Sequence, residues 1–400
     1  MNRRKFLQGV IGVGVCAALP TAAYSQLLVP DLTQLYSGYQ VRFVNTHSHS
    51  TDSDAVSGSP GKIIRANLKR FDGVVLTDHG EQISRLEWEK QGSAARHYCS
   101  NDKVALRGFE WTDPIARLDI AGNWTPNPAY VNSLGHVVVL RTAEYCGVKS
   151  LKGGQPEETG KDFGELLRWI AKHPAAMGIF AHPSLYPVET TFNGFAAPPR
   201  NLPTIVKQFV GCELHRIGDG KEMRSSDEAC FRQLLRVGWK PAPVIGGDEH
   251  RPPYGITVGM TGLYVHEWSP RGFYDALWNR RCFATEDQGS SIHFAAWSDD
   301  HQPVIMGRST PAGRELTVYA EVSTKLRLER ISLVLVSSLG SDEDVIIRSQ
   351  RLAGSQRFGD IVSGDLCRSR KIVCAYARGE MVSQTRSLPR QIIGAPIWLT

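Results

Sequence analysis

The sequence predicts an α/β protein in which a barrel of parallel strands is followed by a small all-β sandwich. From Val41 to about residue 265, eight short apolar runs alternate with segments of helix length, as repeated β/α units do. After about residue 290 the pattern changes to β-rich segments separated by Gly and Ser turns. We therefore expect an export signal over 1–25, a linker over 26–40, a barrel over 41–294 and a β-sandwich over 295–400.

The first 25 residues have the three-part layout of an export signal. A charged start with Arg3, Arg4 and Lys5 precedes the apolar run Val10–Leu19 and a small-residue exit that ends at Ser25. The Arg pair followed by Lys-Phe-Leu resembles the twin-arginine signal, whose pathway exports folded proteins. The alternative is a plain secretory signal with a chance Arg pair. Either signal predicts a periplasmic or secreted protein.

Charge and hydropathy exclude two classes of partner. The chain carries 46 Lys and Arg against 40 Asp and Glu, a net charge of +6, and three of the positive charges lie in the signal. Nucleic acid is therefore not implied, and we expect the Arg-rich stretch 368–390 to be a solvated face of the β part. No stretch after residue 30 approaches the roughly 18 uninterrupted apolar residues of a membrane helix.

The eight cysteines do not form a disulfide framework. Without Cys16 they are an odd set with no C-x-x-C pair. A bridge between Cys367 and Cys374 across a hairpin and two small free strand residues both remain open.

The apolar runs give the strands, and the amphipathic segments between them give the helices. The predicted strands are Val41–Val44, Gly73–Leu76, Val104–Phe109, Val137–Leu140, Gly178–Ala181, Val210–Leu214, Pro243–Gly246 and Thr261–Val265, with Glu315–Val322, Ile331–Ser337, Asp344–Ile347 and Lys371–Tyr376 in the β part. The predicted helices are Lys62–Phe71, Asp162–Lys172 and Ser226–Val237. Three long loops, over 112–135, 147–161 and 183–203, are expected to act as lids.

Polar residues of metal-ligand type lie at the ends of these strands, where barrels place their chemistry. They are His47, His49 and Asp54, then His79, Glu110 and His182, and finally Asp248 and His250. His136 is the exception, because it precedes its apolar run. In both His47-x-His49 and Asp248-x-His250, residues two apart on an extended strand point to the same side. Imidazole and carboxylate ligands without thiolate favour Zn, Mn or Fe.

These motifs, in this order, resemble those of the polymerase and histidinol phosphatase (PHP) metallohydrolases over about residues 41–290. The tail, from Asp275-Ala-Leu-Trp-Asn-Arg-Arg to Ala395-Pro-Ile-Trp-Leu, is similar to a secreted branch that includes carbaryl (carbamate) hydrolases. The resemblance implies a distorted (β/α)7 barrel, so that one of the eight runs lies outside it, and a site for two or three divalent metal ions. It assigns the ligands to three metals: His47, His49, Glu110 and Asp248 to the first, Glu110, His136 and His182 to the second, and Asp54, His79 and His250 to the third. Asp78 and Glu81 are expected to orient ligands.

Three functions fit the sequence. The first is a phosphoesterase acting on a small-molecule ester, because clustered cations activate water and neutralise a phosphoryl oxygen. The second is a carboxylic or carbamate ester hydrolase with the same metals, favoured by the tail and by Trp111, Trp124, Tyr130 and Phe192 in or beside the expected lids. The third is a non-catalytic metal- or ligand-binding protein.

The sequence also offers candidates for catalytic groups beyond the metals. Asp248 or His250 is expected to manage protons, and Arg216 or Arg251 to receive an anionic oxygen. For each arginine a solvated surface position is the alternative. The absence of a Gly-x-Ser-x-Gly motif argues against a serine esterase, and the sequence leaves the oligomeric state open.

Overall fold

The computed structural model describes residues 32–112, 116–118, 124–126, 135–146, 162–185, 191–214, 225–299, 301–348, 357–382 and 389–400. The signal, the first part of the linker, the lid at 147–161, Tyr130 and Arg216 lie outside these residues. The chain is a mixed α/β structure with one large sheet and a separate four-stranded antiparallel sheet. None of the helices in these ranges is long and apolar enough to span a membrane.

Seven strands of the large sheet support the predicted site. They are β1 (Gln40–Asn45), β2 (Gly73–Leu76), β3 (Val104–Thr112), β6 (His136–Leu140), β7 (Met177–Ala181), β8 (Phe209–Glu213) and β9 (Ala242–Val244), hydrogen-bonded in this order. Every neighbouring pair is parallel except the two that involve β6, which runs antiparallel to β3 and β7. The all-parallel expectation is therefore wrong for this one strand.

A closed barrel is not detected. Within the described residues no ladder joins β9 to β1, because the other edge of β1 pairs antiparallel with β10 (Met260–Val265), the eighth predicted run. The two ends of the row meet just beyond the strands instead. There the backbone N–H groups of Gly247 and Asp248 donate to the carbonyl of His47 over 3.1 and 3.0 Å.

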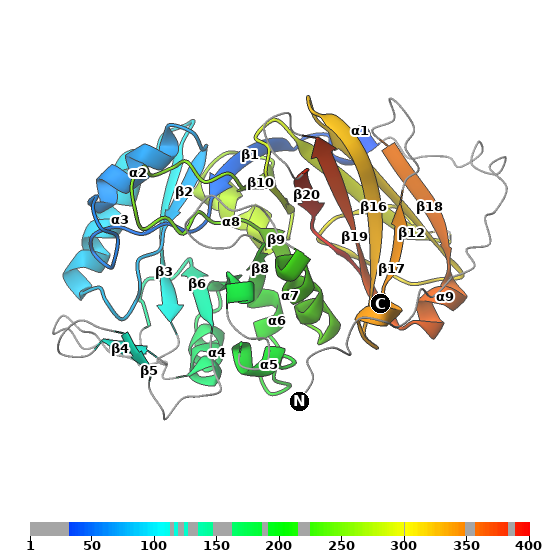
Figure 1. The fold of residues 1–400 in the computed structure, drawn as a ribbon, viewed down its shortest axis with the longest axis horizontal. Coiled ribbons are helices and arrows are strands. Elements are labelled where there is room, and N and C mark those ends of the chain that lie inside the picture. Colours follow the sequence, from blue (N-terminus) through cyan, green and yellow to red (C-terminus); the bar gives the residue numbers. More distant parts are fainter. Residues whose placement is uncertain are drawn as a thin grey trace, which may run out of the picture.

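Helices surround this row of strands, as Figure 1 shows for α2 and α3 beside β2 and β3. The helices are α1 (Leu32–Leu35), α2 (Pro60–Leu68), α3 (Arg85–Tyr98), α4 (Phe163–Lys172), α5 (Phe192–Phe195), α6 (Ile205–Gln208), α7 (Ser225–Arg236), α8 (Pro270–Trp278) and α9 (Gly364–Ser369). Short elements also occur at β4 (Ala116–Leu118), β5 (Trp124–Pro126), η3 (Pro183–Leu185) and η4 (Ser341–Glu343). The three predicted helices correspond to α2, α4 and α7, and Asp162 caps α4 by accepting from the N–H of Glu165.

The C-terminal strands form a sandwich, as the sequence predicts. One layer is β12 (Ser291–Ser298), β13 (Val304–Ile305), β15 (Glu315–Ser323) and β18 (Arg357–Ser363). The other consists of β14 (Ser309–Thr310), β16 (Arg327–Ser337), β17 (Val345–Arg348), β19 (Ile372–Val382), β20 (Arg390–Gly394) and β21 (Ile397–Leu399). The second layer continues through β11 (Cys282–Thr285) into β10 and β1, so a single large sheet runs from the sandwich to the predicted site.

Alternation along β16 shows how this sheet is covered on both faces. Leu333 and Leu335 pack with Phe294 of the four-stranded layer, whereas Val334 and Val336 belong to a second core cluster that contains Phe231 of α7. Successive side chains of a strand point to opposite faces, which explains why one strand contributes to both cores. The described cysteines are all free thiols, including Cys367 and Cys374.

A buried polar cluster joins α7 to the sandwich. Glu228 of α7 accepts hydrogen bonds from the hydroxyl of Tyr376 and, at 2.7 Å, from the guanidinium of Arg378, both on β19. The side chains of Glu228 and Arg378 are only 8% and 16% exposed. Removing one partner of a buried ion pair leaves the other charge without compensation.

We expect Glu228→Ala to lower the free energy of unfolding by about 3 kcal/mol, at the low end of the range for buried pairs because Glu380 still lies 3.4 Å from Arg378. Urea unfolding followed by circular dichroism measures this. The control is Arg85→Ala, which breaks the exposed Arg85–Glu89 pair and should cost no more than about 0.5 kcal/mol. Equal losses in the two variants would contradict the prediction.

Candidate metal centre

The structure brings all nine predicted metal ligands together at one end of the strand row. They are His47, His49, Asp54, His79, Glu110, His136, His182, Asp248 and His250. Eight of them belong to at least one of three overlapping groups of donors, and His182 is in direct contact with Glu110 of these groups. Most follow the carboxyl ends of parallel strands, which meet at the same edge of a sheet.

His136 reaches this edge because β6 is reversed. It is the first residue of β6 and is paired with Thr112 at the end of β3 and with Ala181 at the end of β7. The start of an antiparallel strand lies beside the ends of its neighbours. The irregular position of His136 in the sequence pattern thus follows from the direction of one strand.

The first group is a compact set of four buried donor atoms: Nε2 of His47, Nε2 of His49, Oε2 of Glu110 and Oδ1 of Asp248. Five of the six separations among them are 2.9, 3.0, 3.2, 3.3 and 3.3 Å. Four tetrahedral donors at the zinc distance of about 2.0–2.2 Å lie roughly 3.3–3.6 Å apart, close to these values.

The oxygens of this group fit a cation. Glu110 Oε2 and both carboxylate oxygens of Asp248 are buried and have no hydrogen-bond partner. Buried polar atoms are ordinarily paired, and buried carboxylates bind metals or basic groups. The donor set therefore matches a divalent cation held by two imidazoles and two carboxylates.

Glu110 connects the first group to the second, which consists of His79, Glu110 and His136. Its other oxygen, Oε1, lies 2.8 Å from Nδ1 of His136 and 3.0 Å from Nε2 of His182. A carboxylate that faces two donor sets with its two oxygens can bridge two cations. Nδ1 of His79 also lies 3.3 Å from Oε2 of Glu110, so His79 borders this position as well.

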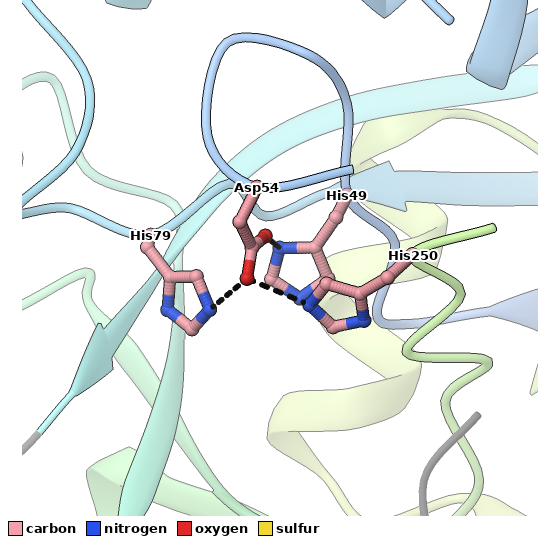
Figure 2. Close-up of side chains that lie close together, drawn as sticks. All are labelled: His49, Asp54, His79 and His250. Atoms are coloured by element: carbon pink, nitrogen blue, oxygen red, sulfur yellow. Dashed lines mark ion pairs between the residues drawn. The ribbon is translucent and has the colours of Figure 1, made fainter. Parts of the chain in front are cut away.

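The third group surrounds Asp54 (Figure 2). Oδ2 of Asp54 lies 3.1 Å from Nε2 of His250 and 3.4 Å from Nε2 of His79, and its Oδ1 lies 3.6 Å from Nδ1 of His49. The side chains of Asp54 and His250 are 30% and 26% exposed, whereas every donor of the first group is at most 5% exposed. Solvent therefore has access from the side of the third group.

Hydrogen bonds set the orientation of several imidazoles. Nδ1 of His250 lies 3.0 Å from the carbonyl of Asp248, and Nδ1 of His79 lies 2.7 Å from the hydroxyl of Thr112. A proton on Nδ1 of His250 leaves its Nε2 as the lone-pair donor that faces Asp54.

Asp248 and His182 also have left-handed backbones, with φ of 47° and 28°, a conformation that costs free energy and is found at functional sites.

The electrostatic field of the carboxylates favours positive charge at this end of the sheet. Burial alone would lower the pKa of His49, but the adjacent carboxylates of Asp248 and Glu110 outweigh it and raise that pKa to about 9. Burial is likewise outweighed by Glu110 and Asp54 at His79, whose pKa rises to about 10. Burial lowers the pKa of His136 to about 4 despite its contact with Glu110. Divalent cations would supply the positive charge that these shifts indicate.

Asp78 stabilises the turn that carries Asp54. It accepts hydrogen bonds from the N–H and hydroxyl of Ser50, at 2.6 and 2.7 Å, from the hydroxyl of Ser53 at 2.6 Å and from Gln91 at 2.9 Å. Glu81 lies 3.6 Å from His79, and burial raises the pKa of Glu81 to about 7. Neither residue belongs to the donor groups.

The donor groups do not include every residue that the sequence predicts for the site. Arg251 is exposed, and Arg216 lies outside the described residues. Trp111 and Phe192 were expected beside substrate-covering lids, but both are buried in the core, so this expectation is wrong. Glu110 faces the donor groups, and its neighbour Trp111 therefore points to the opposite face of β3.

Two residues in contact with the site were missed by the sequence analysis. Glu213, at the end of β8, contacts His47 and His182. The side chain of Asn45 accepts from the N–H groups of His47, at 3.1 Å, and Gly247, at 2.7 Å. Glu213 is a carboxylate at the end of a predicted strand, so the rule that found the other ligands applied to it.

The comparisons with known proteins give weak likenesses only. No family model and no curated protein matches the chain. Among solved structures, the chain is similar to a two-domain protein with a predicted PHP-like metal-dependent phosphoesterase from Bacteroides vulgatus, at 15% identity and a TM-score of 0.41, covering 91% of this chain and 96% of the other. An amidohydrolase from Chromobacterium violaceum has 16% identity and a TM-score of 0.31, covering 52% of this chain and 88% of its own.

A protein from Bifidobacterium adolescentis, described as a candidate metal-dependent phosphoesterase, has 11% identity and a TM-score of 0.31, with coverage of 52% and 87%. The Bacteroides description names the family that the sequence motifs resemble, and none of the three names a carbamate hydrolase.

Gly246 allows the first donor group to close. A Cβ on this residue would lie 2.3 Å from Cβ of His47 and 2.4 Å from Oε1 of Glu213. We expect Gly246→Ala to weaken divalent-metal binding at least tenfold, because His47 or Glu213 must move. Metal content per folded chain after desalting, with folding checked by circular dichroism, measures the loss.

The matched control is Gly289→Ala, where the nearest atom to an added Cβ is 3.6 Å away. Wild-type metal content in Gly246→Ala would contradict the packing argument.

Proposed function

We propose that this chain is an exported metal-dependent phosphoesterase that acts on a small-molecule ester. The observation that carries the proposal is the set of three adjoining nitrogen and oxygen donor groups, which share Glu110, His49 and His79 and are accessible at Asp54 and His250. Hard, negatively charged phosphoryl oxygens suit several closely spaced divalent cations. Zn, Mn and Fe are the candidates, since the donors are imidazoles and carboxylates without thiolate.

Bound cations would supply Lewis acidity toward the phosphoryl oxygen and activate a water molecule. The chain's own residues orient the reaction. His47, His49 and Asp248 form the closed, buried end of the site, and Asp54 and His250 form its accessible end. The substrate therefore enters over His250. His250 at the accessible end, or Asp248 at the buried end, would hold or transfer a proton.

Arg251 immediately follows His250 and is exposed. We propose that Arg251 or Arg216 receives an anionic oxygen of the substrate.

The test compares initial rates of residues 26–400 on p-nitrophenyl phosphate, bis-p-nitrophenyl phosphate, p-nitrophenyl acetate and a p-nitrophenyl carbamate. Rates are measured before chelation, after chelation, and after restoration with Zn, Mn or Fe. We expect phosphoester turnover that chelation abolishes and one of the metals restores. His182→Ala should lower it at least a hundredfold, because Nε2 of His182 lies 3.0 Å from Glu110.

The control is His97→Ala, which removes an exposed histidine outside the donor groups and should leave the rates unchanged. Metal-dependent turnover confined to the acetate or the carbamate would replace the phosphoesterase proposal with a neutral-ester hydrolase. Metal binding without turnover of any substrate would point to a binding protein.

We also propose that the protein is exported to the periplasm or beyond through its twin-arginine-type signal. A pathway for folded proteins would let the site take up its metal in the cytoplasm. Replacing Arg3 and Arg4 with Lys should make most of the protein accumulate as uncleaved precursor in the cytoplasmic fraction, as judged by immunoblotting.

The exposed substitution Arg96→Lys is the control for this experiment and should not affect export. Unchanged export of the double variant would favour the plain secretory alternative.

A further inference from the structure

We propose that Glu213 is a positioning residue. Its one carboxylate orients ligand residues of two metal positions at once. It is 2% exposed and belongs to none of the donor groups. Its Oε1 lies 3.0 Å from Nδ1 of His47, and its Oε2 accepts the backbone N–H of His182 over 3.0 Å. His47 belongs to the first donor group, and His182 contacts the oxygen of Glu110 that faces the second.

The contact with His47 selects the tautomer that binds metal. A carboxylate is only an acceptor, so Nδ1 of His47 must carry the proton that it donates to Glu213. Nε2 then presents its lone pair toward His49, Glu110 and Asp248, from which it is separated by 3.0–3.3 Å. A carboxylate behind a ligand histidine fixes its orientation and increases its basicity.

The contact with His182 holds a strained backbone. His182 has a φ of 28°, which places a non-glycine residue in the left-handed region. The hydrogen bond from its N–H to Glu213 stabilises this conformation, which directs the imidazole toward Glu110. Such strain persists only where the surrounding structure supports it.

The absence of a side chain at Gly246 leaves the space that the carboxylate of Glu213 occupies. An added Cβ on Gly246 would lie 2.4 Å from Oε1 of Glu213, so the carboxylate occupies the space in which a side chain at 246 would lie. The two oxygens of Glu213 each face one N–H group, that of the His47 ring and that of the His182 backbone, one for each metal position.

Glu213→Gln tests this arrangement with almost no change in side-chain shape. Its side chain offers one acceptor oxygen and one NH₂ donor, so it cannot accept from both His47 and His182. If the NH₂ faces Nδ1 of His47, the proton moves to Nε2 and blocks the ligand atom. If it faces the N–H of His182, two donors oppose each other and the strained turn loses its support.

The experiment is a titration of metal-free full-length mature protein with Co²⁺, followed by visible absorption and calorimetry. We expect Glu213→Gln to weaken Co²⁺ binding at the tightest position by 10- to 100-fold, and to reduce the number of ions bound or change the ligand-field spectrum. The far-UV circular dichroism should stay unchanged. A merely structural residue would alter thermal stability without altering the spectrum or the ion count.

Glu249→Gln is the matched control. Glu249 is also buried, lies between the ligands Asp248 and His250, and accepts three backbone N–H bonds from Gly255, Ile256 and Thr257. Its replacement removes the same negative charge near the site and likewise turns an NH₂ toward a backbone N–H, but it touches no ligand imidazole, so Co²⁺ affinity should change less than threefold. Equal losses in Glu213→Gln and Glu249→Gln, or no loss in either, would overturn the inference.

The inference rests on the metal site of the proposed function, and the two can fail separately. Wild-type protein that binds no Co²⁺ contradicts the metal site itself. If the wild-type protein and the Glu213→Gln variant bind Co²⁺ equally well, only the positioning role of Glu213 is contradicted.

Discussion

The concentration of carboxylates at a buried end of the strand row is the constraint on which the rest of the structure depends. Glu110, Asp248 and Glu213 are at most 4% exposed. All three carboxylates lie within a few ångströms of the imidazole of His47. Buried charges of one sign are costly unless opposite charge or hydrogen-bond donors surround them. Glu213 meets this requirement with two N–H groups, whereas Glu110 and Asp248 retain oxygens without hydrogen-bond partners. That difference separates the carboxylate that orients ligands from those that would bind cations.

The reversed strand β6 brings a ligand to the site from the start of a strand, which parallel strands alone do not do. A parallel strand delivers ligands after its last residue, where the following loop must hold them. By entering the sheet antiparallel, β6 delivers its first residue, His136, to the same edge, between the ends of β3 and β7. His136 and His182 therefore flank the same oxygen of Glu110 from two adjacent strands, at 2.8 and 3.0 Å. The donor set around this oxygen depends on strand direction as much as on residue type.

The sequence revealed eight of the nine candidate ligands because strand-end positions can be recognised from local hydropathy, and His, Asp and Glu are unusual there. The ninth, His136, came only from the resemblance of the motif order. The sequence also located the predicted helices α4 and α7 to within one residue at each end. It did not reveal features that depend on contacts between distant segments. The direction of β6, the pairing of β10 with β1, and the fit of Glu213 against Gly246 all join residues far apart in the chain. Trp111 was misjudged for a local reason, since it neighbours Glu110 and side chains alternate between the faces of a strand.

The same long-range pairing gives the C-terminal sandwich a direct connection to the metal centre. Strand β1 pairs with β2 on one edge and with β10 on the other, and it ends at Asn45, two residues before His47. Through β10, β11 and β20 this strand is hydrogen-bonded to the layer that contains β16 and β19. Its position is therefore fixed from both sides, and the side chain of Asn45 extends that restraint to the backbone N–H of His47 and of Gly247. Since Gly247 lies next to Asp248, the sandwich supports His47 and Asp248 of the first donor group through one continuous sheet.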